Sequence, residues 1–300
     1  MSSDPFSGIA AFVRAAESRS FTRAGRLLGV TPSAISKAVS RLEAELGVRL
    51  FHRSVREIVL TGEGEEFFSQ CRDLVHTAED ARASLASGEG SEVRGTLRVC
   101  LPISFGQFVV GLALAPWLAR HPALRVELML TDRYADLAEE RLDLAVRLGE
   151  VPDSRLVARP MPPHRFVTCA SAEYLARRGC PDTPEQLCGH DCLAYIEAAT
   201  GAPRHWVFLR EGQTVHLRPE ARFVTDQAAL LVQQAEAGLG IVQMPRYVVR
   251  APLESGALQA VLPDYAAPGP PLSIVYAQAR HAAPRVRLFV EFLLGLSERL

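Results

Sequence analysis

The chain has 300 residues, of which 48% are hydrophobic and 22% charged, with 33 basic and 34 acidic side chains. This composition is typical of a soluble globular protein and excludes a disordered, fibrous or disulfide-rich chain. Three hundred residues exceed what one core usually holds, so two or three packed units are expected.

The near-zero net charge hides an uneven distribution along the chain. Residues 1–61 carry nine basic and five acidic side chains, whereas residues 62–92 carry two and eight. A basic segment supports nucleic-acid binding only weakly without a motif. The chain opens on no recognisable export signal, and its most apolar stretch, 108–119, is too short to span a bilayer. We therefore expect a cytoplasmic protein with free thiols.

Three short helices are predicted in the first 46 residues. Apolar residues recur at helical spacing from Ile9, and a second helix fits 21–28, ending at Gly29. Thr31-Pro32 then supplies an N-cap and a first-turn proline for a third helix, which ends before Gly47. Extended runs at 49–52 and 58–60 predict a small hairpin, or wing.

One long helix is predicted from Gly62 onward. Apolar residues repeat along it at alternating spacings of four and three: Phe67, Cys71, Leu74, Ala78, Ala81 and Leu85. This heptad seam predicts dimerisation with the same helix of a second chain. The alternative is that the helix lies on its own domain. A Gly-Ser linker follows at 88–91.

Strand-like and helical runs alternate after residue 92, which predicts an α/β fold with largely parallel sheets. The predicted strands are 95–101, 125–130, 144–148, 166–169, 193–196, 206–209, 223–224, 241–243 and 272–276. One predicted helix ends at residue 120 and a second ends at residue 141. Two more span 172–177 and 227–237, and the last begins at residue 284. Proline-rich breaks at 160–163 and 263–271 divide this segment into two lobes, 93–159 plus 266–300 and 160–265.

One face of the third predicted helix suits DNA. Ser33, Ser36, Lys37 and Ser40 fall at i, i+3, i+4 and i+7, and apolar residues occupy the other face. Short hydroxyls let a helix approach base edges, and a lysine reaches guanine acceptors or a phosphate. For this helix alone, a solvated amphipathic helix is the simpler alternative.

An ordered set of residues favours DNA binding. The run from Ser20 to Ser36 (SFTRAGRLLGVTPSAIS), with RLE at 41–43, LGVRLFHR at 46–53 and LTGEG at 60–64, closely resembles the N-terminal signature of LysR-type transcriptional regulators. The resemblance implies a winged helix-turn-helix that binds double-stranded DNA. Its DNA-binding candidates are Thr31, Pro32, Ser33, Ser36, Lys37, Ser40, Arg41, Arg53 and Arg56.

Two departures prevent the base preference from being carried over. Pro32-Ser33 stands where members of the family often have Gln-Pro, and a glutamine reads adenine bidentately. Lys37 stands where arginine is common, and an ammonium lacks the planar fork of a guanidinium.

The resemblance continues more loosely through 95–99, 121–122, 143–149, 190–193 and 237–241. It implies a two-lobed effector domain of periplasmic-binding-protein type at 93–300, after a DNA-binding domain at 1–61 and a dimerising linker helix at 62–92. Ligands of open α/β sheets sit beyond the carboxyl ends of strands. The effector-binding candidates at such places are Ser104, Phe105, Thr131, Arg147, Ile196, Thr225 and Asp226. Each has a plainer alternative as a helix cap, core residue or structural ion-pair residue.

The expected partners follow from this organisation. Two paired reading helices require an inverted repeat in the DNA. The resemblance implies that this repeat is interrupted and that a homodimer or a dimer of dimers binds it. A small-molecule effector is expected between the lobes, and Arg147 favours an anionic one. RNA polymerase is a further candidate partner. No cofactor, metal or membrane is expected.

Two other interpretations are open. Cys180, Cys188 and Cys192 crowd near His190, which suggests a thiol-based redox-responsive regulator of the same family, although the spacing matches no strong metal template. An enzyme is the alternative from another class, but no nucleophile elbow or phosphate-binding loop is present, and Gly238-Leu-Gly240 lacks the third glycine of a dinucleotide motif. A transport-type binding protein would leave residues 1–61 without a role.

Overall fold

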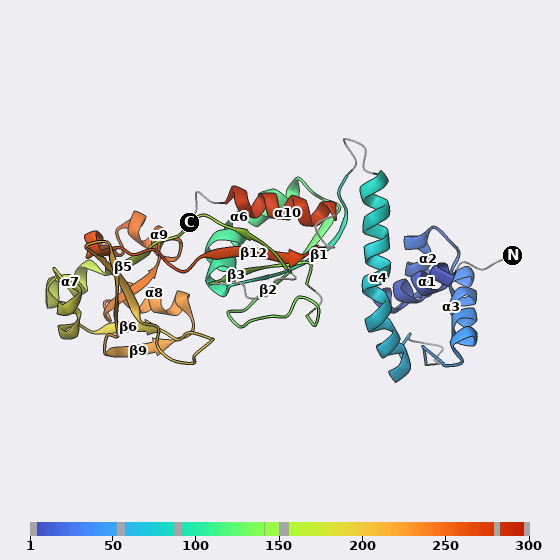
Figure 1. The fold of residues 1–300 in the computed structure, drawn as a ribbon, viewed down its shortest axis with the longest axis horizontal. Coiled ribbons are helices and arrows are strands. Elements are labelled where there is room, and N and C mark those ends of the chain that lie inside the picture. Colours follow the sequence, from blue (N-terminus) through green and yellow to red (C-terminus); the bar gives the residue numbers. More distant parts are fainter. Residues whose placement is uncertain are drawn as a thin grey trace. The chain divides into compact units, whose positions relative to one another are not determined.

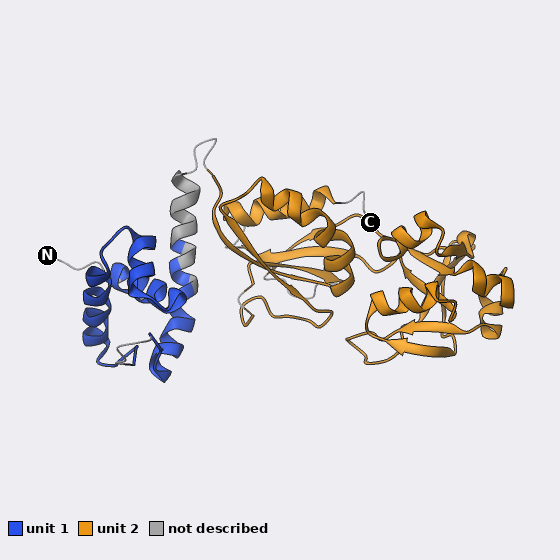
Figure 2. Cartoon of the chain, turned by 180° about the vertical axis from the view of Figure 1, so that it is seen from behind, with its two compact units in different colours: residues 1–90 blue, residues 91–300 orange. Residues whose placement is uncertain are grey.

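The computed structural model of the chain describes residues 5–52, 58–86, 92–140, 142–149, 156–278 and 283–296. The chain divides into two compact units, Met1–Gly90 and Ser91–Leu300 (Figures 1 and 2). The predicted wing tip with Arg53 and Arg56, and the linker at 88–91, lie outside the described residues.

The first unit contains the three predicted helices and the fourth, longer one. Its helices are α1 (Pro5–Ser18), α2 (Phe21–Leu28), α3 (Pro32–Leu46) and α4 (Gly62–Ala86). The Ser20 hydroxyl caps α2 by accepting the N–H of Arg23, and α2 ends at Gly29, whose φ of 67° suits glycine. The core between the helices includes Phe12, Ile35 and other buried apolar residues. The prediction of these helices is confirmed.

Close packing explains two glycines in this unit. A Cβ on Gly25 would lie 2.7 Å from the carbonyl oxygen of Val30, so a side chain there would push α2 away from the turn that leads to α3. A Cβ on Gly64 would lie 2.0 Å from the carbonyl oxygen of Leu50, so only glycine lets α4 pass the base of the wing.

The stem of the wing is paired as predicted. Phe51 and Leu60 form an antiparallel bridge. The N–H of His52 donates to the carbonyl of Val59 at 2.9 Å, and the N–H of Thr61 donates to the carbonyl of Leu50 at 3.0 Å.

The heptad seam of α4 needs a correction. Cys71 is buried in the core of its own unit, and Phe67 packs on Phe12 with ring centroids 5.6 Å apart. Leu74 is 64% exposed and Ala78 is half-buried, whereas the side chains of Ala81 and Leu85 lie outside those described. The first half of α4 therefore lies on its own domain, and the seam as predicted is wrong for Cys71 and, in part, for Phe67.

The second unit contains two five-stranded sheets, each with four parallel strands and one antiparallel strand. The first sheet has the order β2-β1-β3-β12-β4: β1 (Gly95–Leu101), β2 (Leu124–Leu130), β3 (Leu144–Leu148), β4 (Leu156–Pro160) and β12 (Leu272–Ala277). The second has the order β11-β5-β10-β6-β9: β5 (Phe166–Ala170), β6 (Cys192–Tyr195), β9 (Ala221–Thr225), β10 (Ile241–Pro245) and β11 (Gln259–Val261). The prediction of largely parallel sheets is confirmed.

Helices cover the sheets (Figure 1). In the first lobe a helical stretch of α5 (Ile103–Phe105), a π-helical segment (Gly106–Val110) and α6 (Gly111–Ala119) packs against α10 (Pro284–Gly295), with Trp117 between Phe289 and Phe292. The second lobe has α7 (Ala172–Arg178), α8 (Ala228–Glu236) and α9 (Arg246–Ser255), and a hairpin of β7 (Trp206–Arg210) and β8 (Gln213–Leu217). None of the helices in the described part of the chain has the length and apolarity of a membrane span.

The predicted helix ending at residue 141 is wrong. Residues 137–140 form a turn, which Asp136 stabilises by accepting the N–H groups of Ala138 and Glu139 at 2.7 and 3.0 Å.

The chain crosses between the two sheets at residues 161–165 and 262–271, where the sequence has its proline-rich breaks. The two crossing segments run antiparallel, since Arg165 and Pro268 form a bridge and the N–H of Gly269 donates to the carbonyl of His164 at 2.9 Å. A Cβ on Gly269 would lie 2.0 Å from the Nε2 atom of His164, so glycine is required where the imidazole packs against the second crossing.

Candidate DNA-binding face and effector cavity

The predicted reading face of α3 is exposed. Ile35, Val39 and Leu42 are buried on the side that faces α1 and α2. All the predicted residues on and before α3 are exposed: Thr31, Pro32, Ser33, Ser36, Lys37, Ser40 and Arg41. Val30, Ala34, Ala44, Glu45 and Leu46 are exposed as well. The helix therefore separates an anchoring side from a polar side, as the period of 3.6 requires.

Local contacts fix the start of this face and leave its cation unpaired. The Thr31 hydroxyl accepts the N–H of Ala34 at 3.2 Å and lies 3.0 Å from the hydroxyl of Ser33. Lys37, the single lysine of the chain, forms no ion pair within the described residues. An exposed, unpaired cation among hydroxyls can bind a phosphate or a guanine edge.

Glu43 holds the wing stem against α3 and was not predicted from the sequence. Its carboxylate accepts the N–H groups of Leu50 and Phe51 at 2.8 and 3.2 Å and a guanidinium N–H of Arg49 at 2.7 Å. Burial acts to raise the pKa of Glu43, but these hydrogen bonds and the charge of Arg49 outweigh it and lower the pKa. The available signal was an acid among the apolar positions of α3.

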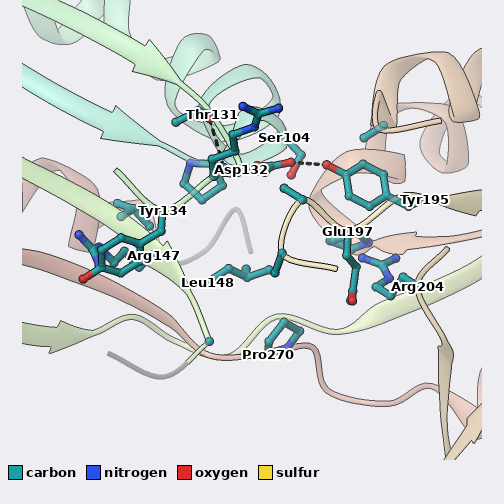
Figure 3. A pocket seen from close by; sticks show the side chains of 18 of the residues that line it. Ser104, Thr131, Asp132, Tyr134, Arg147, Leu148, Tyr195, Glu197, Arg204 and Pro270 are labelled. Carbon is teal, nitrogen blue, oxygen red and sulfur yellow. Dashed lines mark hydrogen bonds between the residues drawn. The ribbon is translucent and has the colours of Figure 1, made fainter. Parts of the chain in front are cut away.

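A cavity of about 490 Å³ lies between the two lobes of the second unit (Figure 3). Three predicted effector residues line it from the first lobe, namely Ser104, Thr131 and Arg147. The second lobe contributes Tyr195, Glu197, Arg204 and Tyr247, which sequence reasoning missed.

Four predicted effector residues do not line the cavity. The ring of Phe105 is fully buried and packs edge-on against Tyr247. Ile196 is held in a bridge with Pro203. The Thr225 hydroxyl accepts the N–H of Gln227 at 3.2 Å, and the Asp226 carboxylate accepts the side-chain amide of Gln227 at 3.1 Å. Gln227 is itself the N-cap residue of α8, and no side chain among the described residues caps that helix.

Asp132 links the two lobes across the cavity. One carboxylate oxygen accepts the N–H of Ile103 at 2.9 Å, and the other accepts the hydroxyl of Tyr195. A second contact joins the hydroxyls of Ser104 and Tyr247 at 3.4 Å. The start of the helix at Ile103 is thus occupied by a carboxylate of the protein. Burial and the Asp132 charge together raise the pKa of Tyr195.

Two arginines of the cavity wall lack a carboxylate partner among the described residues. Arg147 is 8% exposed and donates from Nη2 to the carbonyl of Ala135 at 2.7 Å, whereas its Nη1 has no hydrogen-bond partner in the described part of the chain. The ring of Tyr134 lies 3.5 Å from its guanidinium carbon. Arg204 donates from Nη2 to the carbonyl of Gln243 at 3.0 Å and lies over the ring of Phe166, and its Nε has no partner among the residues that the structure describes.

His164 also lines the cavity and is 1% exposed. Neither ring nitrogen has a hydrogen-bond partner among the described residues, and the rings of Phe166 and Tyr247 pack against it. Burial and, secondarily, the charge of Arg204 lower the pKa of His164 to about 4, so it is neutral at pH 7.

The three clustered cysteines differ in exposure. Cys180 and Cys188 are exposed, whereas Cys192 is buried and directs its thiol toward the carbonyl of Leu187. Burial raises the pKa of Cys192 to about 12, so its thiol stays protonated at neutral pH and is a poor nucleophile. The described residues contain no group of three or more His, Cys, Asp or Glu side chains arranged for a metal ion.

Comparison with known proteins gives two family matches. Residues 6–65 match the bacterial regulatory helix-turn-helix protein, lysR family, and residues 90–297 match the LysR substrate binding domain. A probable HTH-type transcriptional regulator, LtrA of Klebsiella pneumoniae, is 32% identical over 288 residues, which are 95% of this chain and 92% of LtrA.

Solved structures agree with these matches. CrgA, a LysR-type transcriptional regulator from Neisseria meningitidis, is 29% identical, with a TM-score of 0.63 over 99% of each chain. A Corynebacterium glutamicum OxyR C206 mutant has a TM-score of 0.67 over 100% of this chain and 93% of its own, but at 18% identity it shows only the shared fold. The chain belongs to the LysR-type family and is a DNA-binding transcriptional regulator with an effector-binding domain, not an enzyme.

Proposed function

We propose that the exposed side of α3 reads the DNA of the target site. Its contacts are Thr31, Pro32, Ser33, Ser36, Lys37, Ser40 and Arg41, with Arg53 and Arg56 of the wing beside the groove. The observation that carries this proposal is the unpaired Lys37 amid exposed hydroxyls on a helix whose other side is buried. Phosphate contacts of the cations add affinity that falls with salt.

Pairing of two chains supplies the second reading head. Leu74, largely exposed, and Ala78, half-buried, are apolar positions of α4 that are open to a partner. We place Ala81 and Leu85 in the same contact. A homodimer built in this way, or a dimer of dimers, requires an interrupted inverted repeat in the DNA. Bound to that DNA in the cytoplasm, the regulator lies beside RNA polymerase. The corresponding division of the chain is 1–61, 62–92 and 93–300.

The effector occupies the cavity between the lobes and is an organic anion. Arg147 supports this assignment because its guanidinium is buried without a carboxylate partner in the described part of the chain. An unpaired buried charge is costly, and a bound anion compensates it. Ser104 and Thr131 supply hydroxyls from the same lobe. Ligand binding changes regulation only through different affinities for two arrangements of the lobes.

Selection of DNA from a random library by the full-length protein tests the DNA-binding proposal. We expect an interrupted inverted repeat to be enriched, and Lys37→Ala to bind that sequence at least about tenfold more weakly, as the loss of one charge-assisted contact predicts. Arg19→Ala, which removes an exposed cation outside α3, is the control and should keep most of the affinity. Failure to enrich any sequence, or equal effects of the two substitutions, overturns the proposal.

A further inference from the structure

Each lobe contributes to the cavity an arginine without a carboxylate partner among the described residues. Arg147 lies on β3 of the first lobe, and Arg204 lies between β6 and β7 of the second. Each leaves one buried nitrogen without a partner among the described residues, and neither forms an ion pair there. Figure 3 shows Arg147 and Arg204 on opposite sides of the cavity.

The remaining charges of the lining do not satisfy these two arginines. Asp132 is engaged by Ile103 and Tyr195. Glu197 lies on the second lobe near Arg204 but forms no salt bridge with it. The lining as a whole carries three guanidinium groups, with Arg133 the third, and two carboxylates. An excess of positive charge therefore faces the cavity.

We propose that the effector is an elongated organic dianion, with one acidic group bound by Arg147 and the other by Arg204. This inference rests on the proposed function, in which the cavity holds the effector. Guanidinium groups bind carboxylates through paired, charge-assisted hydrogen bonds. Apolar side chains such as Val146, Leu148 and Met244 line the cavity as well and suit a hydrocarbon spacer.

Tyr134 covers the acid-binding edge of the cavity. Its ring stacks on Arg147, and its side chain is 61% exposed with no hydrogen bond from its hydroxyl within the described residues. Moving this ring away gives up one exposed cation–π contact, which is weaker than the charged hydrogen bonds that an acid supplies. We therefore expect Arg147 to exchange the Tyr134 ring for the acidic group when the effector binds.

Calorimetric titration of the full-length protein tests this ligand class. The probes are straight-chain α,ω-dicarboxylates of four to ten carbons, with the monocarboxylate and the dimethyl ester of each length. We expect at least one dicarboxylate to bind about tenfold or more tightly than its monocarboxylate, because it gains a second charged contact. Arg147→Gln and Arg204→Gln should each reduce the dicarboxylate to the affinity of the monocarboxylate. Arg218→Gln, at an exposed position outside the lining of the cavity, should not.

The outcomes separate this inference from the function on which it rests. A monocarboxylate that binds as tightly as the dicarboxylate, in a manner abolished by Arg147→Gln, overturns the dianion and leaves an anionic effector. If no acid of the series binds, both the dianion and the anionic effector are overturned. If Arg147→Gln does not fold, Arg147→Lys and Arg204→Gln give the same comparison, because an ammonium keeps the charge but loses the bidentate contact. An unchanged dicarboxylate preference in Arg204→Gln also overturns the inference.

Discussion

Substitution of His164 is expected to remove a specific loss of stability in acid. The imidazole is buried without a hydrogen-bond partner among the described residues, and its pKa is lowered to about 4. In the unfolded chain the same group titrates near pH 6.5. Between these values the unfolded state binds more protons, so the folded state is destabilised as the pH falls from about 6.5 to about 4.

Linkage gives the size of the effect. The difference between 6.5 and about 4 corresponds to about 3 kcal/mol of lost stability in full, of which about 2 kcal/mol is lost between pH 7 and pH 5. His164→Leu removes the titrating group while keeping a buried side chain of similar volume. We expect its free energy of unfolding to fall by about 2 kcal/mol less than that of the wild type over this range.

Urea unfolding followed by tryptophan fluorescence measures this difference. The chain has two tryptophans, Trp117 and Trp206, both buried in the second unit, so their signal reports on that unit. His216→Leu is the matched control, because His216 is exposed and should leave the pH dependence as it is. Equal losses of stability between pH 7 and pH 5 in the wild type and His164→Leu would refute the reasoning.

Two further predictions concern the base of the wing. Glu43→Ala should accelerate hydrogen exchange of the Leu50 amide by about tenfold or more, because a buried donor loses a charged acceptor worth about 1.5–3 kcal/mol. Glu45→Ala, at an exposed position, should leave that exchange rate unchanged. Equal exchange in both variants would contradict the anchoring role of Glu43. Gly64→Ala should lower the thermal unfolding midpoint of the helical circular dichroism signal by several degrees, because its Cβ clashes with Leu50 at a cost of about 1–3 kcal/mol. Gly62→Ala, with nothing within 4 Å of its Cβ, should not lower the midpoint. An unchanged midpoint in Gly64→Ala would show that the backbone at Leu50 moves to make room for the methyl group.

Local signals made the reading head predictable. The capping hydroxyls of Ser20 and Thr31, the proline that follows, and the left-handed Gly29 and Gly47 act within a few residues of the helix ends that they define. The 3.6-residue period then separates the buried and exposed sides of α3. Both kinds of information are contained in a short window of sequence, which is why α2 and α3 were predicted to the residue.

The same period misled for α4, because an apolar stripe records burial without identifying the partner. Cys71 satisfies the heptad spacing, yet it meets the core of its own unit. Leu74 occupies an equivalent position in the same heptad spacing, yet its side chain is exposed. Only the packing of α4 on α1 distinguishes the two.

The cavity was predicted in part. Strand ends identified Ser104, Thr131 and Arg147, since the carboxyl ends of parallel strands in a sheet share an edge. Its contacts with the second lobe were not predictable, because Asp132 and Tyr195 are 63 residues apart and meet only when the two lobes are assembled. Arg204 stands outside any strand, so no periodicity marks it.

Protection of Lys37 from an amine-reactive acetylating reagent tests the DNA-binding account most directly. Because Lys37 is the single lysine, mass spectrometry of its peptide measures the reactivity of one side chain on α3. With the sequence selected from the random library, its modification should slow by about tenfold or more, since the amine is held against a base edge or phosphate. Random DNA at the same concentration and moderate salt should protect it far less. Lys37 reacting at the rate of the free protein, while the protein is saturated with the selected DNA, would contradict the account.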